Sequence, residues 1–153
     1  MQSGAPFTPS FTTSPTVDIT GSASIGARIQ VVGSGTAAPS SPTINGLPVM
    51  FNTSAFAVPA VGTLGNAGVN ILYGPGFSNV DTSLAKRIQV GQSERRVFVL
   101  RVDGTNVLNH TEFSALNTAA TFNAAGAQIN NSFGTPSGTR PARILTGVLR
   151  FEF

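Results

Sequence analysis

The last ten residues of the chain alternate between apolar and polar side chains, which is the pattern of a β-strand whose two faces meet different environments. Arg150 and Glu152 fall on one face of this segment, and the other face is apolar. Burial of one large apolar side chain contributes roughly 1.5–3 kcal/mol, so such a face is expected to be covered. We therefore predict an assembly face, formed by Leu145, Leu149, Phe151 and Phe153.

Two further segments, residues 79–86 and 97–106, show the same period of two. Together they predict a polar strand face made of Asn79, Asp81, Ser83, Arg101 and Asp103. Arg101 and Asp103 stand two residues apart on this face, a spacing that favours an ion pair along the strand.

This alternation has two explanations, and the sequence leaves both open. An antiparallel sheet can pack one face on a soluble core, or a membrane barrel can turn its apolar face to lipid and its polar face to the lumen. Only 10% of the residues are charged, against about 25% in a typical soluble domain. The low charge and the terminal aromatic residue favour the barrel. The predicted fold class is all-β, with antiparallel strands from the C-terminal end of a large barrel.

The first 75 residues have a different composition. They contain eight of the ten prolines and only two charged residues, Asp18 and Arg28. Proline cannot donate a backbone hydrogen bond to a sheet. We predict a Pro/Gly/Ser-rich loop region with weak strands over residues 1–75, and antiparallel strands over 76–153. Residues 1–65 are expected to be ordered by contacts rather than by a core of their own.

Within these regions, turns are predicted at residues 74–76, 91–94 and 134–138, where glycine and proline cluster. Residues 115–128 lack a clean helical period and are predicted to be loop or weak strand.

The sequence points away from several function classes. The chain has no cysteine and one histidine, His110, which cannot build an ordinary zinc site. We expect His110 to be a turn residue that bonds the backbone or Glu112. The arginines are scattered, which argues against nucleic acid as a partner, and no apolar run reaches the ~18 residues of a membrane helix. No enzyme activity, no cofactor and no metal site are predicted, and the N-terminus lacks the features of a signal peptide.

Several strings of the sequence resemble one family when they are taken in order. The first four are residues 2–9, 51–56, 64–86 and 101–113, and the fifth is the final segment ending in Phe153. In this order they resemble the C-terminal end of TonB-dependent outer-membrane receptors of the Oar-like type, which carry a carboxypeptidase-regulatory-like N-terminal domain. The resemblance covers nearly the whole chain.

This resemblance implies strands of an outer-membrane barrel in a Gram-negative bacterium. The Arg-x-acid strand and the following Asn and Asn-His of the family match Arg101, Asp103, Asn106, Asn109 and His110. The terminal aromatic, matched by Phe153, implies recognition by the barrel assembly machinery. Two departures stand out: bulky aromatics of the family are replaced by Gly104 and Thr105, and another by Ala85.

Length leads to the expected function. Such receptors have 22 strands and a plug, whereas 153 residues supply about four or five strands and cannot transport alone. We expect a non-enzymatic structural protein that self-assembles by edge-strand pairing into a filament or multimer at the outer membrane or cell surface. The alternative is an excised part of a nutrient-uptake receptor. Expected partners are copies of the chain, the outer membrane and the barrel assembly machinery.

Overall fold

The computed structural model of the chain describes residues 2–21, 26–37, 39, 43–91 and 96–153. Thirteen strands, and no α-helix, are found in these residues; one short 3-10 turn, η1, spans Thr53–Ala55. The all-β fold class is therefore confirmed. The chain divides into two compact units, which are described separately: unit 1 contains residues 77–112 and 140–153, and unit 2 contains residues 2–76 and 113–139.

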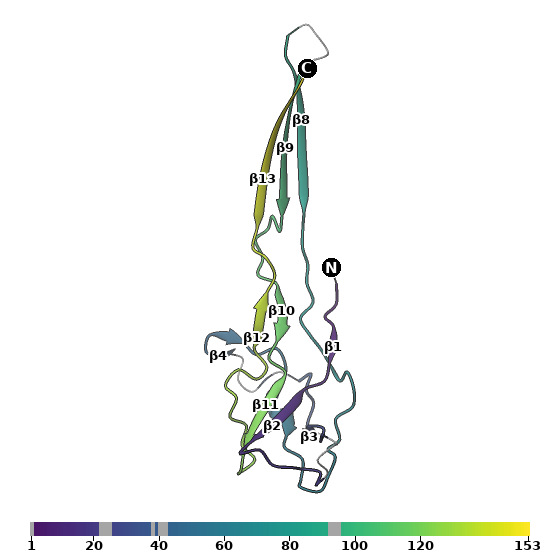
Figure 1. Ribbon diagram of the computed structural model, residues 1–153, viewed down its shortest axis with the longest axis vertical. Helices are drawn as coiled ribbons and strands as arrows, with labels where there is room; N and C mark the ends of the chain where they lie inside the picture. Colours follow the sequence, from purple (N-terminus) through teal and green to yellow (C-terminus); the bar gives the residue numbers. More distant parts are fainter. Residues whose placement is uncertain (1, 22–25, 38, 40–42, 92–95) are drawn as a thin grey trace. The chain divides into compact units, whose positions relative to one another are not determined.

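Unit 1 is built on three long strands. β8 (Thr82–Gln89) and β13 (Ile144–Glu152) both pair with the central strand β9 (Val97–Thr105), and all pairings are antiparallel (Figure 1). These strands are the alternating segments of the sequence. The first of them begins at Thr82 rather than at Asn79, because residues 80 and 81 hydrogen-bond the turn that follows β9 instead of continuing the strand ladder.

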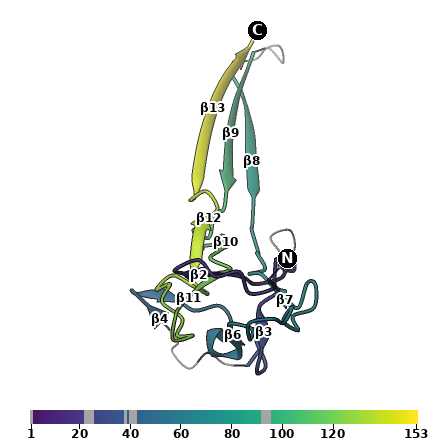
Figure 2. The same ribbon diagram turned by 60° about the horizontal axis from the view of Figure 1, so that its bottom comes forward.

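Unit 2 is built from short strands in five separate pairs (Figure 2). Four pairs are antiparallel, and their strands are two to four residues long. They are β1 (Pro6–Phe7) with β7 (Leu72–Tyr73), β3 (Gln30–Val31) with β6 (Phe56–Ala57), β4 (Thr43–Ile44) with β5 (Leu47–Pro48), and β10 (Phe113–Leu116) with β12 (Pro136–Thr139).

The fifth pair of unit 2 is parallel, which the prediction of antiparallel strands missed. β2 (Ser10–Ser14) pairs with β11 (Ala119–Asn123) over five residues, and the two strands lie side by side in both ribbon views (Figures 1 and 2). The pairing joins segments more than 100 residues apart. No local turn signal can announce such a pair, because parallel strands are never joined by a hairpin.

The predicted turn at residues 134–138 is also corrected. Gly134 has a φ of 87° and does turn the chain, but Pro136 opens β12 and pairs with Leu116. The first residue of a strand is one of the few sheet positions that tolerates proline, since no ladder donor is required there.

Unit 2 has a hydrophobic core, to which residues 1–65 contribute together with other segments, so these residues have no separate core of their own in the described structure. Phe51 makes edge-to-face contacts with Phe56 and Phe133, at centroid distances of 5.9 and 5.3 Å. The buried cluster comprises Ile29, Phe51, Ala55, Phe56, Ala67, Leu72, Ala120, Phe122 and Phe133. Four of these come from residues 1–65 and three from residues 113–139, so the core is shared between two distant segments.

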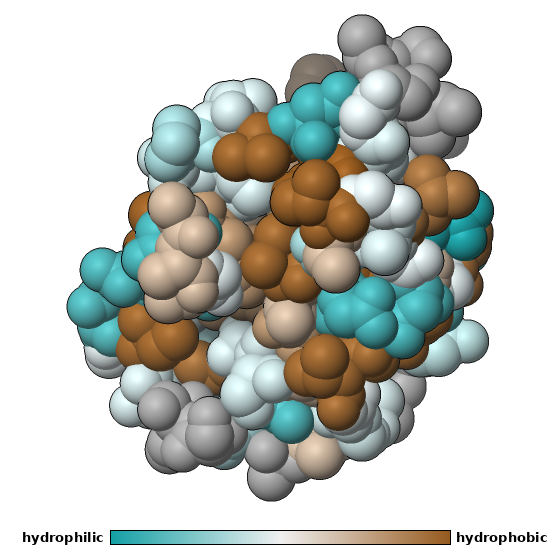
Figure 3. Space-filling view, turned by 90° about the horizontal axis from the view of Figure 1, so that it is seen from below, coloured by the Kyte–Doolittle hydropathy of each residue, from teal (hydrophilic) through white to brown (hydrophobic). Residues whose placement is uncertain are grey.

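The surface of unit 2 is mixed. Exposed apolar side chains such as Val61 and Val69 occur in it. The face of the molecule in Figure 3 shows apolar patches separated by polar ones. Scattered exposed apolar residues of this kind are ordinary on a protein that meets water.

Candidate functional site

The three-stranded sheet of unit 1 sorts its side chains by face. The pairing register places Lys86, Leu100 and Leu149 in one row, and Ile88, Phe98 and Phe151 in the next row of the same face. This apolar face is made of Thr82, Leu84, Lys86, Ile88, Phe98, Leu100, Val102, Gly104, Leu145, Gly147, Leu149, Phe151 and Phe153.

The apolar face is uncovered within unit 1. Leu84 is 75% exposed, Leu149 is 69% exposed and Phe153 is 94% exposed. The four residues of the predicted assembly face lie on it together, and two of them form an aromatic cluster with Phe98. The Phe98 and Phe151 rings are 4.7 Å apart, and those of Phe151 and Phe153 are 5.8 Å apart. A sheet with this much exposed apolar surface requires a non-aqueous neighbour.

The opposite face is polar. The Ser83 hydroxyl donates to Asp103 Oδ1 at 2.6 Å, and Arg101 Nε donates to the same oxygen at 2.9 Å. The ion pair between Arg101 and Asp103 is thus present, and a cross-strand hydrogen bond joins it to β8. These three residues of the predicted polar strand face share one face of the sheet.

A second ion pair on the polar face spans the sheet. Arg87 Nη2 of β8 lies 3.1 Å from Glu152 Oε2 of β13, although β9 runs between these two strands. Arg150 Nε approaches the other oxygen of Glu152 at 3.4 Å. The bridge crosses β9 near Val97, which is buried although it lies on this face. We name Arg87–Glu152 the transverse bridge.

Gly104 stands at a position where the resembling family has a bulky aromatic residue, and the structure gives a reason for the glycine. A Cβ built on it would lie 2.5 Å from Val107 Cγ1 and 3.1 Å from Leu145 Cδ2. The space that a side chain would need is already filled by these two neighbours, so glycine is the residue that this packing admits.

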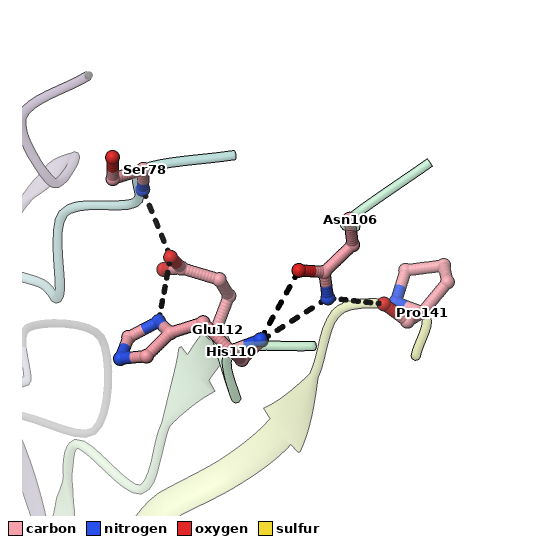
Figure 4. A network of polar contacts seen from close by, with 5 residues as sticks. All are labelled: Ser78, Asn106, His110, Glu112 and Pro141. Carbon is pink, nitrogen blue, oxygen red and sulfur yellow. Dashed lines mark hydrogen bonds and ion pairs between the residues drawn. The ribbon is translucent and has the colours of Figure 1, made fainter. Parts of the chain in front are cut away.

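The end of the sheet opposite the β8–β9 connection is held by a polar junction, formed by Ser78, Asn79, Asp81, Asn106, His110, Glu112, Arg140 and Pro141. Asn106 is its centre, with a φ of 50° and an exposed fraction of 7%. Its side-chain oxygen accepts from the His110 backbone N–H at 3.2 Å, and its amide nitrogen donates to the carbonyls of His110 and Pro141 (Figure 4). Asparagine tolerates this left-handed conformation better than most residues.

Glu112 is the second buried member of the junction, with an exposed fraction of 7%. Its Oε1 accepts from the Ser78 backbone N–H at 3.0 Å and lies 3.0 Å from His110 Nδ1 (Figure 4). The Ser78 N–H, followed by the His110 ring, holds the pKa of the Glu112 carboxyl below its ordinary value. The predicted role of His110 as a turn residue bonded to Glu112 is confirmed.

Asn79 and Asp81 belong to this junction rather than to the polar strand face. Asn79 Nδ2 donates to Asp81 Oδ1 at 2.9 Å, and the same oxygen accepts from the Asn106 backbone N–H at 3.0 Å. The two residues precede β8 in a segment without regular secondary structure, where Asp81 bonds the turn that follows β9.

A match to a protein-family model decides the identity of the chain. Residues 1–146 match the outer membrane beta barrel domain. The chain belongs to this family. Its place is the outer membrane of a Gram-negative bacterium, as the sequence predicted. Searches of curated proteins and of solved structures each found no match.

Family membership gives the two faces of the sheet a context. Barrels of the outer membrane alternate lipid-facing apolar residues with lumen-facing polar ones. Neither a cluster of metal-binding side chains nor a helix long and apolar enough to span a membrane occurs in the described residues.

The sequence alone missed two parts of the junction. Ser78 contributes only its backbone N–H, which no residue type reveals. Arg140 places its guanidinium 3.8 Å from the centre of the Phe77 ring, and its backbone N–H donates to the Glu112 carbonyl at 2.8 Å. The pair is 63 residues apart in the sequence, and only the shared strand end brings it together.

Proposed function

We propose that β8, β9 and β13 form part of the wall of a TonB-dependent receptor of the Oar-like type, a non-catalytic outer-membrane barrel that takes up nutrients. The observation that carries this proposal is the separation of faces in the sheet. One face is uncovered and apolar, and the other carries five charged residues. Water on both sides would leave the apolar face unexplained, whereas lipid on one side and a polar lumen on the other accounts for both.

The connections of the sheet suggest its orientation in the membrane. Residues 90–96 join β8 to β9 at one end, and residues 106–143 join β9 to β13 at the other. Outer-membrane barrels have short periplasmic turns and longer extracellular loops. The β8–β9 end is therefore assigned to the periplasm. The end at which residues 106–143 join β9 to β13 is assigned to the cell surface.

The receptor type is supported by the positions, in the structure, of the segments that resemble Oar-like receptors. Residues 64–86 run from unit 2 through the junction into β8, and residues 101–113 run from β9 through Asn106 and Glu112. The residues that match the family's Asn and Asn-His are thus those that fix the polar junction. Their match reflects a structural requirement at the strand end in addition to sequence likeness.

Single-cysteine labelling tests the barrel wall directly, because the chain has no cysteine of its own. Nitroxide labels at Leu84 and Leu145 should be accessible to oxygen dissolved in lipid, and labels at Ser83 and Thr146 should be accessible to a water-soluble nickel reagent. The protein would be studied in outer membranes of a Gram-negative host. Equal water accessibility at all four positions would overturn the proposal.

Uptake is tested separately. A strain that lacks the protein should lose growth on the transported nutrient to the same extent as a strain that lacks TonB. A growth defect in only one of the two strains would argue against TonB-dependent uptake, but it would not contradict the proposed barrel wall.

A second candidate function, self-assembly into a filament or multimer, is favoured by the edges of the sheet. Within the described residues, β8 and β13 each pair on one side only. Unpaired edges of this length recruit further strands, either from the same barrel or from copies of the chain. Electron microscopy of the purified chain distinguishes the two: filaments support self-assembly, and ring-shaped particles in detergent support a barrel.

A further inference from the structure

The polar face of the sheet carries more positive than negative charge. In β8, β9 and β13, all of whose residues the structure describes, this face holds three arginines and two carboxylates, which leaves one positive charge in excess. The charged residues are Arg87, Arg101, Arg150, Asp103 and Glu152. The pairing register separates the two signs along the face.

The three arginines occupy two adjacent rows in the middle of the polar face. Arg101 lies in one row, and Arg87 and Arg150 lie in the next row, on either side of β9. Asp103 and Glu152 lie in the rows that flank these two. Arg101 is therefore a diagonal neighbour of both other arginines. Diagonal neighbours in a sheet are about 7–8 Å apart, a distance that long side chains can bridge, so three strands can direct a guanidinium group to one ligand.

The arginines are also the most accessible charged groups of this face. The side chains of Arg87, Arg101 and Arg150 are 69%, 55% and 72% exposed. Those of Asp103 and Glu152 are only 35% and 33% exposed. The closest contact of each ion pair is made by one guanidinium nitrogen. A guanidinium group has five N–H donors, so it can bind a carboxylate of the sheet and a second oxyanion at the same time.

We propose that Arg87, Arg101 and Arg150 form a binding site for an oxyanion, a carboxylate or phosphate group, on the lumenal side of the wall, and that the nutrient carries such a group. The planar fork of arginine matches both groups, and arginine or lysine side chains select anions in membrane pores. One positive charge in excess complements one negative charge on the ligand. This inference rests on the proposed receptor and adds the chemical class of its substrate.

Arginine modification of the complete outer-membrane protein tests the site. Phenylglyoxal reacts with guanidinium groups, and mass spectrometry gives the rate at each arginine. Sodium phosphate and sodium acetate, the probes of the two groups, should slow the modification of Arg87, Arg101 and Arg150 several-fold relative to sodium chloride. The ionic strength is held equal, so that screening is the same in all three salts. Arg143, which is exposed and directly precedes β13, is the control and should react at one rate throughout.

Substitutions show whether the three arginines act together. Arg150→Gln should remove most of the protection at Arg87 and Arg101, because the ligand loses one of its three contacts. Arg150→Lys keeps the charge without the fork and should retain part of the protection. The matched control is Lys86→Gln, which removes the same charge from the apolar face and should leave the protection unchanged.

The site is overturned if phosphate and acetate both protect no more than chloride, or if they protect Arg143 as strongly as Arg150. It is also overturned if Lys86→Gln removes the protection as fully as Arg150→Gln. The barrel wall is tested separately by the nitroxide labels at Ser83 and Leu84. It fails if the Leu84 label meets water, whatever the arginines do, so the two failures are distinguishable.

Discussion

Phenylalanine is used in opposite ways by the two units of this protein. In unit 2, Phe51, Phe122 and Phe133 are buried in a core. In unit 1, Phe151 and Phe153 are exposed on one face of a three-stranded sheet. Unit 2 buries apolar residues in its own core, between short strands and loops. Unit 1 leaves them exposed on one face of its sheet. The difference is the one expected for the proposed barrel wall, in which one face of unit 1 meets lipid.

The largest expected effect is in the core of unit 2. Phe122→Ala should lower the free energy of unfolding of this unit by about 3–5 kcal/mol, because Phe122 is 1% exposed and its removal leaves a cavity. The measurement is hydrogen exchange of the amides in β2 and β11. The same substitution at Phe98, on the exposed face of the sheet, serves as the control and should leave those amides unchanged. Equal effects of the two substitutions would break the contrast between the units.

A charge on the apolar face of unit 1 should have the next largest effect. Leu149 lies in the middle of the five rows of the apolar face, and so near the membrane centre in the proposed orientation. Leu149→Arg should destabilise the protein in vesicles by about 2–4 kcal/mol, which urea titration of the folded form measures. Thr146→Arg, on the polar face, is the control and should cost less than about 1 kcal/mol. The reverse order would place lipid on the other face.

Gly104 and Gly147 allow two glycines on the apolar face to be compared. Gly104→Val should cost about 1–3 kcal/mol in the same urea titration, because the new side chain overlaps Val107 and Leu145. Gly147 is also on the apolar face, but a Cβ there meets nothing within 4 Å. Gly147→Val is therefore expected to be neutral or stabilising. A similar cost at both glycines would show that side-chain overlap is not the cause.

The smallest expected effect is a pH dependence of the polar junction. Glu112 has an ordinary pKa near 4.5, and the folded state lowers it. Its contribution to stability is therefore complete above the unfolded-state pKa and is lost as the pH falls through the folded-state pKa. Exchange of the Ser78 amide should accelerate as the pH drops through this range, after correction for intrinsic exchange. Glu112→Gln should remove this dependence, and a dependence that persists in the variant would assign it to another group.

The sequence predicted unit 1 better than unit 2, for a physical reason. In a strand with two different faces, apolar and polar residues alternate along the sequence. The ends of β9 and β13 were therefore predicted to within one residue. The core of unit 2 depends on contacts such as Phe51 with Phe133, which no period records. The parallel pairing of β2 with β11 has the same difficulty, since residues 119–123 resemble a loop in composition.

The junction was predictable only in part. His110 and Glu112 stand two residues apart, so their ion pair follows from extended backbone. The remaining contacts join the ends of different strands, for example Asn106 with Pro141 and Ser78 with Glu112. These contacts depend on the order of strands in the sheet, which alternation alone does not determine.

The transverse bridge bears on the curvature of the sheet. Strands two apart are separated by about 9–10 Å in a sheet, yet Arg87 and Glu152 meet at 3.1 Å on one face only. An attraction between outer strands on a single face shortens that face relative to the other, and so favours a sheet that is concave on its polar side. A wall that bends in this direction encloses its charged side chains and presents its apolar side chains outward, as the circumference of a closed cylinder requires.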